Sequence, residues 1–456
     1  MSFATKIATT ALSAAIVAAC ALPQTAHAQS ERELALEARV AELERMVQSL
    51  VSQQQTLTTQ QQATAQQLDA MPAARSLPAG TQPVQATSIM PNALAGTRFS
   101  YGGFIKFDAM ATDTPDGLIA DGSAGRLFYL PGAIPVGGSN DDAYTDVHAQ
   151  FSRFWFGADS ETDNGDKLKA YLEFDLFGGG SNALLGNEVA TNTHGLALRQ
   201  AYVSWNKWLA GQTWSNFQDT AALPDAVDFV GTTEGTIFVR QAQIRYTNGP
   251  WSVSLENPET TVQAFGGATR SNSENNVLPD ATARWITKGD WGHFTVAGLL
   301  RQLRVNTPGG DQSDTGAALS ASGKFVLGPS DDIRYMVNAG SGIGRYLGFG
   351  ISADAVANAG GDIDAIDGYG AFAAWRHVFS PKVRTNLMYS TAMFDNDKVN
   401  TGFGVTEKVH SFHANVIYTP IAKLDVGAEL IWAQRQLEDA REGDLRRLHM
   451  SVKYNF

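Results

Sequence analysis

Basic side chains recur on one face of segments in which apolar and polar residues alternate. In an extended strand, alternate side chains point to opposite sides, so each of these segments has an apolar and a polar face. The planar guanidinium of arginine binds a carboxylate or a phosphate through two parallel hydrogen bonds. A strip of such side chains would attract small anions, although any water-filled wall also needs hydrophilic groups. The candidates are Lys106, Arg153, Lys169, Arg240, Arg245, Arg284, Arg301, Arg334 and Arg384.

Two arginines do not fit the alternation of their segments. These are Arg199 and Arg240, and a charge that faced lipid at mid-membrane would cost about 2–4 kcal/mol. We therefore expect both at a bulge, at a rim or in a subunit interface. Arg240 is kept among the candidates for the polar strip.

Acidic candidates lie in the long segment Gln218–Gly235. This segment is less polar than the other long connections and carries four acids among apolar residues. That mixture fits a loop folded against the inner wall of a barrel, where it would narrow the lumen; an ordinary external loop is the alternative. We expect the loop residues Asp219, Pro224, Asp225, Asp228 and Glu234 to lie near the narrowest point or to anchor the loop to wall arginines.

The end of the chain indicates the scaffold that positions these residues. One parity of the last strand is apolar and the other is polar: Leu448, Met450, Val452, Tyr454 and Phe456 against Arg447, His449, Ser451, Lys453 and Asn455. An alternating strand that ends on an aromatic residue is typical of an outer-membrane β-barrel, in which lipid lies outside and water inside. The edge strand of a soluble β-sandwich is the alternative.

Alternation predicts an all-β transmembrane barrel of about 16 antiparallel strands over 98–456. Short and long connections alternate, as periplasmic turns and external loops do in such barrels. The expected strands are Phe99–Thr112, Ala149–Ser160, Lys167–Phe177, Leu196–Asn206, Trp208–Phe217, Thr236–Thr247, Trp251–Glu256, Ala281–Lys288, His293–Arg304, Thr315–Leu327, Ile333–Ile343, Tyr369–Phe379, Val383–Phe394, Lys408–Thr419, Lys423–Gln436 and Leu445–Phe456.

Three segments precede the predicted barrel. Residues 1–28 read as a signal peptide that ends in a small-x-small cleavage site, although Cys20 also stands in a lipobox-like context. Residues 29–70 carry a heptad seam and predict a coiled-coil stalk in the periplasm, with a solvated Gln-rich segment as the alternative. Residues 71–97 form a Pro-rich linker.

Composition argues against other classes of function. The formal net charge is −12, which makes nucleic acid an unlikely partner. Much of the negative charge lies in predicted loops, so local wall charge should dominate within the screening length of ~8–10 Å. Ser411 and His413 share a strand face, but no orienting acid is evident, and we expect no enzyme, no metal site and no cofactor.

Three segments resemble the DcaP-like porins of Gram-negative outer membranes: Gly211–Phe217, Leu223–Phe229 and Val239–Tyr246. The resemblance implies a trimeric, 16-stranded diffusion channel with a periplasmic stalk that passes small anionic solutes such as dicarboxylates. Other expected partners are outer-membrane lipid, lipopolysaccharide and, through the stalk, peptidoglycan. A phosphate- or sugar-selective porin, or a structural barrel that anchors the outer membrane to the cell wall, are the alternatives.

Overall fold

The computed structural model describes residues 97–178, 191–307 and 310–456. The predicted signal peptide, the coiled-coil stalk and all but the last residue of the predicted linker lie outside the described residues. The first strand begins at Arg98, which is where the predicted barrel begins.

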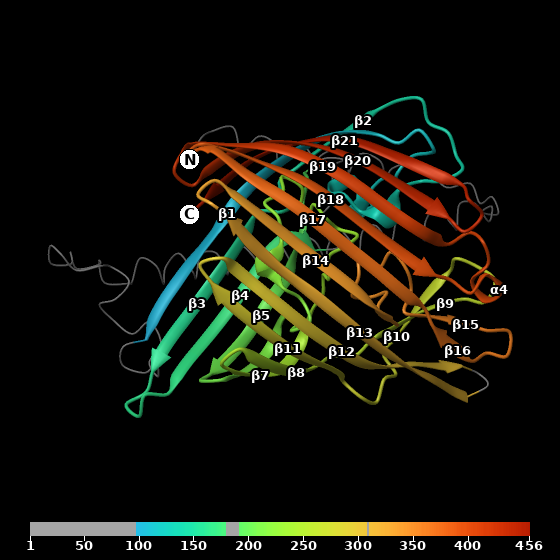
Figure 1. Cartoon of the computed structure of the whole chain (residues 1–456), viewed down its shortest axis with the longest axis horizontal. Helices are drawn as coiled ribbons and strands as arrows, with labels where there is room; N and C mark the ends of the chain where they lie inside the picture. The colour runs from blue at the N-terminus through green and yellow to red at the C-terminus, as the bar shows by residue number, and fades with distance from the viewer. Residues whose placement is uncertain (1–96, 179–190, 308–309) are drawn as a thin grey trace, which may run out of the picture. The chain divides into compact units, whose positions relative to one another are not determined.

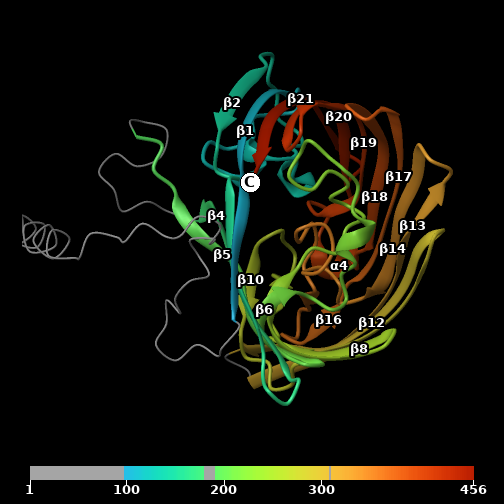
Figure 2. The same cartoon turned by 90° about the vertical axis from the view of Figure 1, so that its left-hand side faces the viewer.

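In the described residues, sixteen antiparallel strands close into a barrel. Figures 1 and 2 show how the strands curve around the lumen. Strands that follow one another along the ring pair side by side, and β21 pairs with β1 to close it. The barrel strands are β1 (Arg98–Asp113), β3 (Arg153–Glu161), β4 (Lys167–Gly178), β5 (Gly195–Trp205), β6 (Trp208–Trp214), β7 (Arg240–Asn248), β8 (Trp251–Glu256), β11 (Asp280–Gly289), β12 (Gly292–Thr307), β13 (Gly310–Leu327), β14 (Asp331–Ser341), β17 (Asp367–Ser380), β18 (Val383–Asp395), β19 (Thr406–Ile421), β20 (Leu424–Leu437) and β21 (Glu442–Asn455). The predicted antiparallel barrel is thereby confirmed.

Three predicted strand starts were wrong by four residues or more. The strand predicted from Thr315 begins five residues earlier, at Gly310. The segment predicted from Ala149 begins only at Arg153, because a short strand, β2 (Tyr144–His148), pairs with β1 beyond the end of β3. The segment predicted from Thr236 begins only at Arg240, because the preceding residues continue an inward loop. In that loop the Phe238 N–H donates to the Tyr346 carbonyl at 2.9 Å.

The last strand shows how sequence alternation becomes an inside and an outside. In β21, Leu448, Met450 and Val452 are exposed, while Arg447 and His449 are buried. Side chains of the first kind face lipid and those of the second face the barrel interior, as expected for a transmembrane strand.

A bulge in β5 explains one of the two arginines that break the alternation. Glu173 pairs with Gln200 and Phe174 with Leu198, so Arg199 is an extra residue in β5. The bulge turns Arg199 inward, where its side chain bonds to carboxylates of β4. Arg240 is the first residue of β7, at the point where the inward loop rejoins the wall.

Three long connections enter the barrel: residues 114–143, 215–239 and 342–366 (Figure 2). They carry the short helices α3 (Ala124–Leu127), η1 (Pro131–Ala133) and η2 (Thr220–Ala222). Strands β9 (Thr260–Gln263), β10 (Arg270–Ser273), β15 (Ala355–Ala357) and β16 (Ile363–Ala365) form a second, four-stranded sheet, and α4 (Lys398–Thr401) lies in a later loop. Within the described ranges, no helix is long and apolar enough to cross a membrane.

The inward segments build an apolar core inside the barrel. Tyr129, Ile237 and Leu347 come one from each segment, and they belong to the same buried cluster as Met336 and Phe372 of the wall. The inward segments therefore fill much of the lumen. A solute can pass only through the part of the lumen that these segments leave open.

Candidate functional site: the lumen and its inward loop

The loop 218–235 is held against the inner wall by its acidic residues. Asp219 lies 2.8 Å from Nε2 of His293 on β12 and accepts a hydrogen bond from Ser322 on β13 at 3.0 Å. Asp225, which follows the buried Pro224, accepts from Nε of Arg384 on β18 at 2.5 Å. Asp225 therefore pairs with a wall arginine, whereas Asp219 contacts a histidine and a serine of the wall and no arginine.

The second half of the loop is fixed by residues that are fully buried. The Asp228 carboxylate accepts from the Tyr129 backbone N–H at 2.8 Å and lies 3.4 Å from Nδ1 of His449. Glu234 accepts from the Tyr129 hydroxyl and from Ser411 Oγ, the latter at 3.0 Å. These acids therefore anchor the loop and have no free charge to offer a solute.

The pKa of Asp228 reflects this environment. Burial raises the pKa of its carboxyl, but hydrogen bonds from His449 and from the backbone N–H groups of Tyr129 and Val230 outweigh burial, so the pKa lies well below its ordinary value. Asp228 therefore stays ionised and bonded in mildly acidic solution.

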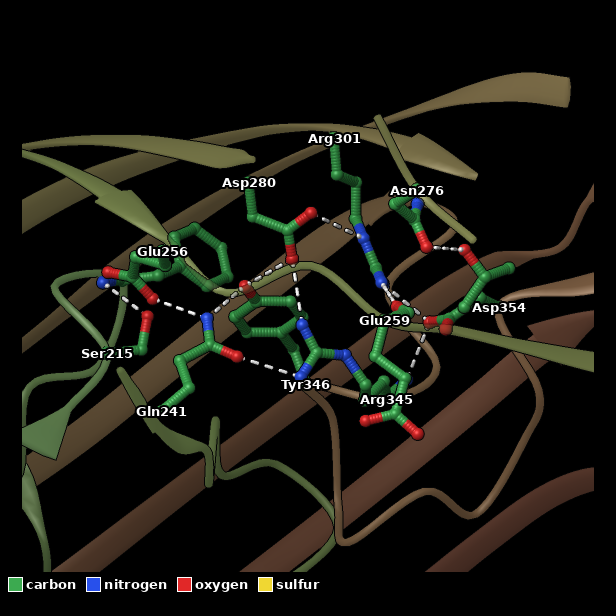
Figure 3. A network of polar contacts seen from close by, with 12 residues as sticks. Ser215, Gln241, Glu256, Glu259, Asn276, Asp280, Arg301, Arg345, Tyr346 and Asp354 are labelled. Carbon is green, nitrogen blue, oxygen red and sulfur yellow. Dashed lines mark hydrogen bonds and ion pairs between the residues drawn. The ribbon is translucent and has the colours of Figure 1, made fainter. Parts of the chain in front are cut away.

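A buried charge network ties the segment 342–366 to the wall (Figure 3). Arg301 on β12 lies 2.7 Å from Asp354 and 3.6 Å from Asp280, and none of these three side chains is exposed. Arg345 and the Tyr346 hydroxyl both donate to the second oxygen of Asp280, each at 2.8 Å. Arg301 does point inward, as predicted, but its charge is neutralised here and it faces no solute path.

The wall made by β3, β4 and β5 is covered only in part: Phe177 at the end of β4 packs against Phe128 and Phe229 of the inward segments, while Arg153 on β3 stays partly exposed. We call it the open wall. On it Arg199 bonds to Glu173 at 2.9 Å and to Asp175 at 2.7 Å. Arg153 lies farther from the same carboxylates, at 3.8 Å and 3.5 Å, and its side chain is 20% exposed. Arg153 therefore shares its carboxylates with Arg199 and stays accessible.

Three further arginines continue from the open wall and contact only neutral groups. Arg240 stacks over the Trp214 ring at 4.8 Å, and its Nη1 is buried with no hydrogen-bond partner among the described residues. Arg245 donates to Gln243 at 2.9 Å, and Arg284 donates to the Gln218 carbonyl at 3.1 Å. We call Arg153, Arg199, Arg240, Arg245 and Arg284 the arginine belt. Glu173 and Asp175 pair with Arg153 and Arg199, while Glu256 acts on Arg245 and Arg284 at longer range, and Asp219 acts on Arg284 as well. Five cations against these four carboxylates leave a local surplus of one positive charge.

The remaining predicted basic residues lie apart from the belt. Lys106 is buried and bonds to Asp108 at 2.5 Å and to the Val227 carbonyl at 2.9 Å. Lys106, Arg384 and Lys453 line a small, partly open pocket beneath the loop, together with Asp225 and Asp425.

Arg334 and Lys169 complete the set of predicted positions. Arg334 pairs with Asp332 at 2.8 Å and also donates to the carbonyl of Leu223 in the loop. Lys169 is half exposed and lies 3.9 Å from Asp159. Among the described residues, no contact links either side chain to the belt.

Several residues of the site were not predicted from the sequence. Arg199 was noticed only as an anomaly, and its position two residues from the apolar Ala197 and Ala201 gave no sign of the bulge. Arg345 and Tyr129 lie in long connections without alternation, so no pattern could place them inside. Lys453 could have been found, because it shares the polar parity of the last strand.

One group resembles a hydrolytic triad. His413 lies 3.1 Å from Ser411 Oγ through Nε2 and 2.9 Å from Glu429 through Nδ1, so the orienting acid missing from the sequence reading is Glu429. Ser411 donates its proton to Glu234, so Nε2 of His413 is the donor to Oγ and not a base. All three side chains are fully buried, which makes this group part of the loop anchor.

No metal site competes with this interpretation in the described ranges. There, no group of three or more His, Cys, Asp or Glu side chains is placed to hold an ion.

Comparison with known proteins identifies the family. A model of the family described as DcaP outer membrane protein matches residues 19–456. The outer membrane channel DcaP of Acinetobacter baumannii is similar in structure, with a TM-score of 0.64 and 22% identity over 80% of this chain and 99% of that one. A loop-deletion mutant of OmpT from Vibrio cholerae has a TM-score of 0.49 and 12% identity over 79% of this chain and 99% of that one. No curated protein sequence matches the chain. The chain belongs to the DcaP outer membrane protein family and is a non-enzymatic porin of the outer membrane.

Proposed function

We propose that this porin passes small anions, including aliphatic dicarboxylates, along the arginine belt. The observation that carries the proposal is the difference in pairing between the belt and the loop. The loop acids each have a partner in the wall or in a neighbouring segment, while three arginines of the belt contact only neutral groups.

The belt suits carboxylates for a physical reason. A guanidinium fork binds a carboxylate through two hydrogen bonds, and several forks along one path let a solute with two carboxylates bind at two points. Such binding must also be weak enough to allow exit, which several adjacent sites of moderate strength provide.

The short strands on one side of the barrel support assembly with neighbouring copies, as a trimer requires. β6 has seven residues and β8 has six, whereas β12 has 16 and β13 has 18. At about 3.4 Å per residue and a tilt of roughly 40°, six residues span about 16 Å, less than the apolar band of about 25 Å. We infer that neighbouring copies cover this low part of the wall, which closed rotational symmetry allows.

Planar-bilayer recording with succinate and with its neutral analogue succinamide tests the proposed solute class. Because the two molecules are close in size, a charge-dependent path predicts concentration-dependent block by succinate and none by succinamide. Equal block by both would show that the path selects by size, and the proposal would fail.

A further inference from the structure

Three aromatic side chains stand on the open wall directly beside the belt. Trp155 on β3 stacks with Tyr171 on β4, with ring centroids 5.9 Å apart and planes at 23°. Tyr171 stacks in turn with Tyr202 on β5, at 5.4 Å and 30°. All three rings are partly exposed. We call these residues the aromatic track.

The rings are held in place by their surroundings. The Tyr171 hydroxyl donates to Glu173 at 3.0 Å, which ties the track to the carboxylates of the belt. Trp155 lies over Gly102 of β1, where a Cβ atom would come within 2.7 Å of the indole. A side chain at position 102 would displace the indole, so the glycine makes room for it.

A second aromatic surface borders the belt on the loop side. Arg240 stacks over Trp214, and Arg199 lies 5.5 Å from the ring of Phe229, which belongs to the inward loop. The cationic groups of the belt therefore lie between two apolar, aromatic surfaces. Along β3, Trp155 follows Arg153 by two residues, which separates them by about 7 Å along the strand.

That spacing matches a molecule with a planar ring and an attached carboxylate. The carboxylate would bind a guanidinium of the belt, and the ring would stack on the track, where an aromatic pair gains about 0.5–1.5 kcal/mol beyond burial and therefore about fivefold in affinity. A neutral sugar would leave the belt without a counter-charge, and an aliphatic acid would gain no ring stacking.

We propose that the open wall contains a stacking subsite for aromatic carboxylates, formed by Trp155, Tyr171 and Tyr202 beside the arginine belt. The proposal rests on the proposed anion path and goes beyond it, because it adds a preference for a planar ring over other carboxylates of equal charge.

Single-channel recording of the full chain in KCl tests the subsite. The probes are benzoate, cyclohexanecarboxylate with the same charge and a non-planar ring, and benzyl alcohol with the ring and no charge. Trp155→Leu should shorten the residence time of benzoate about fivefold and leave that of cyclohexanecarboxylate nearly unchanged. Trp208→Leu, which removes an exposed tryptophan at the start of β6, is the matched control and should change neither.

Tyr202→Leu is a second variant in case Trp155→Leu fails to assemble, and it should act in the same direction. An unchanged benzoate residence in both variants would overturn the subsite. So would an equal loss for cyclohexanecarboxylate, which indicates plain apolar contact, or equal block by benzyl alcohol, which removes the role of the belt. The zero-current potential in a KCl gradient, recorded in the same bilayers, reports separately on the anion path.

Discussion

The two sides of the lumen use charge in opposite ways. The covered wall, made by β12–β14 and β18–β21, meets the inward segments, and its charges are paired in dry contacts such as Arg301 with Asp280 and Asp354. In the arginine belt, by contrast, Arg240, Arg245 and Arg284 contact only neutral groups. A charge that is paired and buried contributes to structure, whereas only an accessible and unbalanced charge can act on a passing ion.

The difference follows from desolvation. Moving a charge out of water is costly unless a partner and further hydrogen bonds replace the lost hydration. Where the loop covers the wall, its acidic side chains lie beside histidines and arginines of the wall, as Asp219 lies beside His293. Arg153 of the belt is 20% exposed, so water can supply part of the hydration that a closer partner would replace. The number of arginines on a lumen face therefore does not measure ion preference.

Arg301→Met should have the largest effect on stability. It leaves Asp280 and Asp354 buried without their cation, which should cost about 3–5 kcal/mol. Arg304→Met on the same strand is the control, because its partner Asp311 is exposed and the pair should contribute at most about 1 kcal/mol. Thermal unfolding of the refolded barrel measures both, and equal losses would contradict the distinction between the two kinds of pair.

Removing charge from the arginine belt should change ion preference with little loss of stability. The double variant Arg153→Gln and Arg240→Gln removes two of the five positive charges of the belt, and we expect the chloride-to-potassium permeability ratio to drop by roughly threefold or more. Arg446→Gln removes an exposed cation at the outer end of β21 and should leave the ratio unchanged. A similar drop in both variants would mean that overall charge controls preference.

Loosening the loop without removing it should affect conductance more modestly. Glu234→Gln weakens the bonds from Tyr129 and Ser411 and should destabilise the anchored loop by about 1–3 kcal/mol. We expect more frequent current fluctuations in single-channel records. Asp439→Asn in the turn after β20 is the control, and quiet records from Glu234→Gln would show that the loop is held by other contacts.

The smallest effect should be that of mild acid on the Asp228 anchor. Because the pKa of Asp228 in the folded protein is depressed, its stabilising contribution is fully present above its unfolded pKa and is lost only as pH falls through the lower folded value. At about pH 4, where a free aspartate is half protonated, the loop should stay anchored. Wild type and Asp228→Asn should then show the same relative change in conductance between about pH 7 and pH 4, and a step found in wild type alone would contradict this.

Much more of the barrel than of the candidate site could be predicted from the sequence. Alternation locates each barrel strand because lipid enforces an apolar outer face, and turn residues such as Asn248 and Gly249 mark the hairpins. Parity also tells which face Arg301 occupies. It cannot tell that Asp354, from a connection about fifty residues later, neutralises Arg301, because partners within the lumen are set by loop paths that have no period. The bulge at Arg199 is hidden for a related reason, since one extra residue reverses parity without a change in composition.

The zero-current potential of the purified wild-type channel under a KCl gradient is the most direct test of the central claim. If the arginines of the belt control the electrostatic potential in the lumen, the zero-current potential has the sign of chloride preference at neutral pH, despite a chain with a formal net charge of −12. A potential with the sign of potassium preference would contradict the account, since the carboxylates held here in pairs would then control the path.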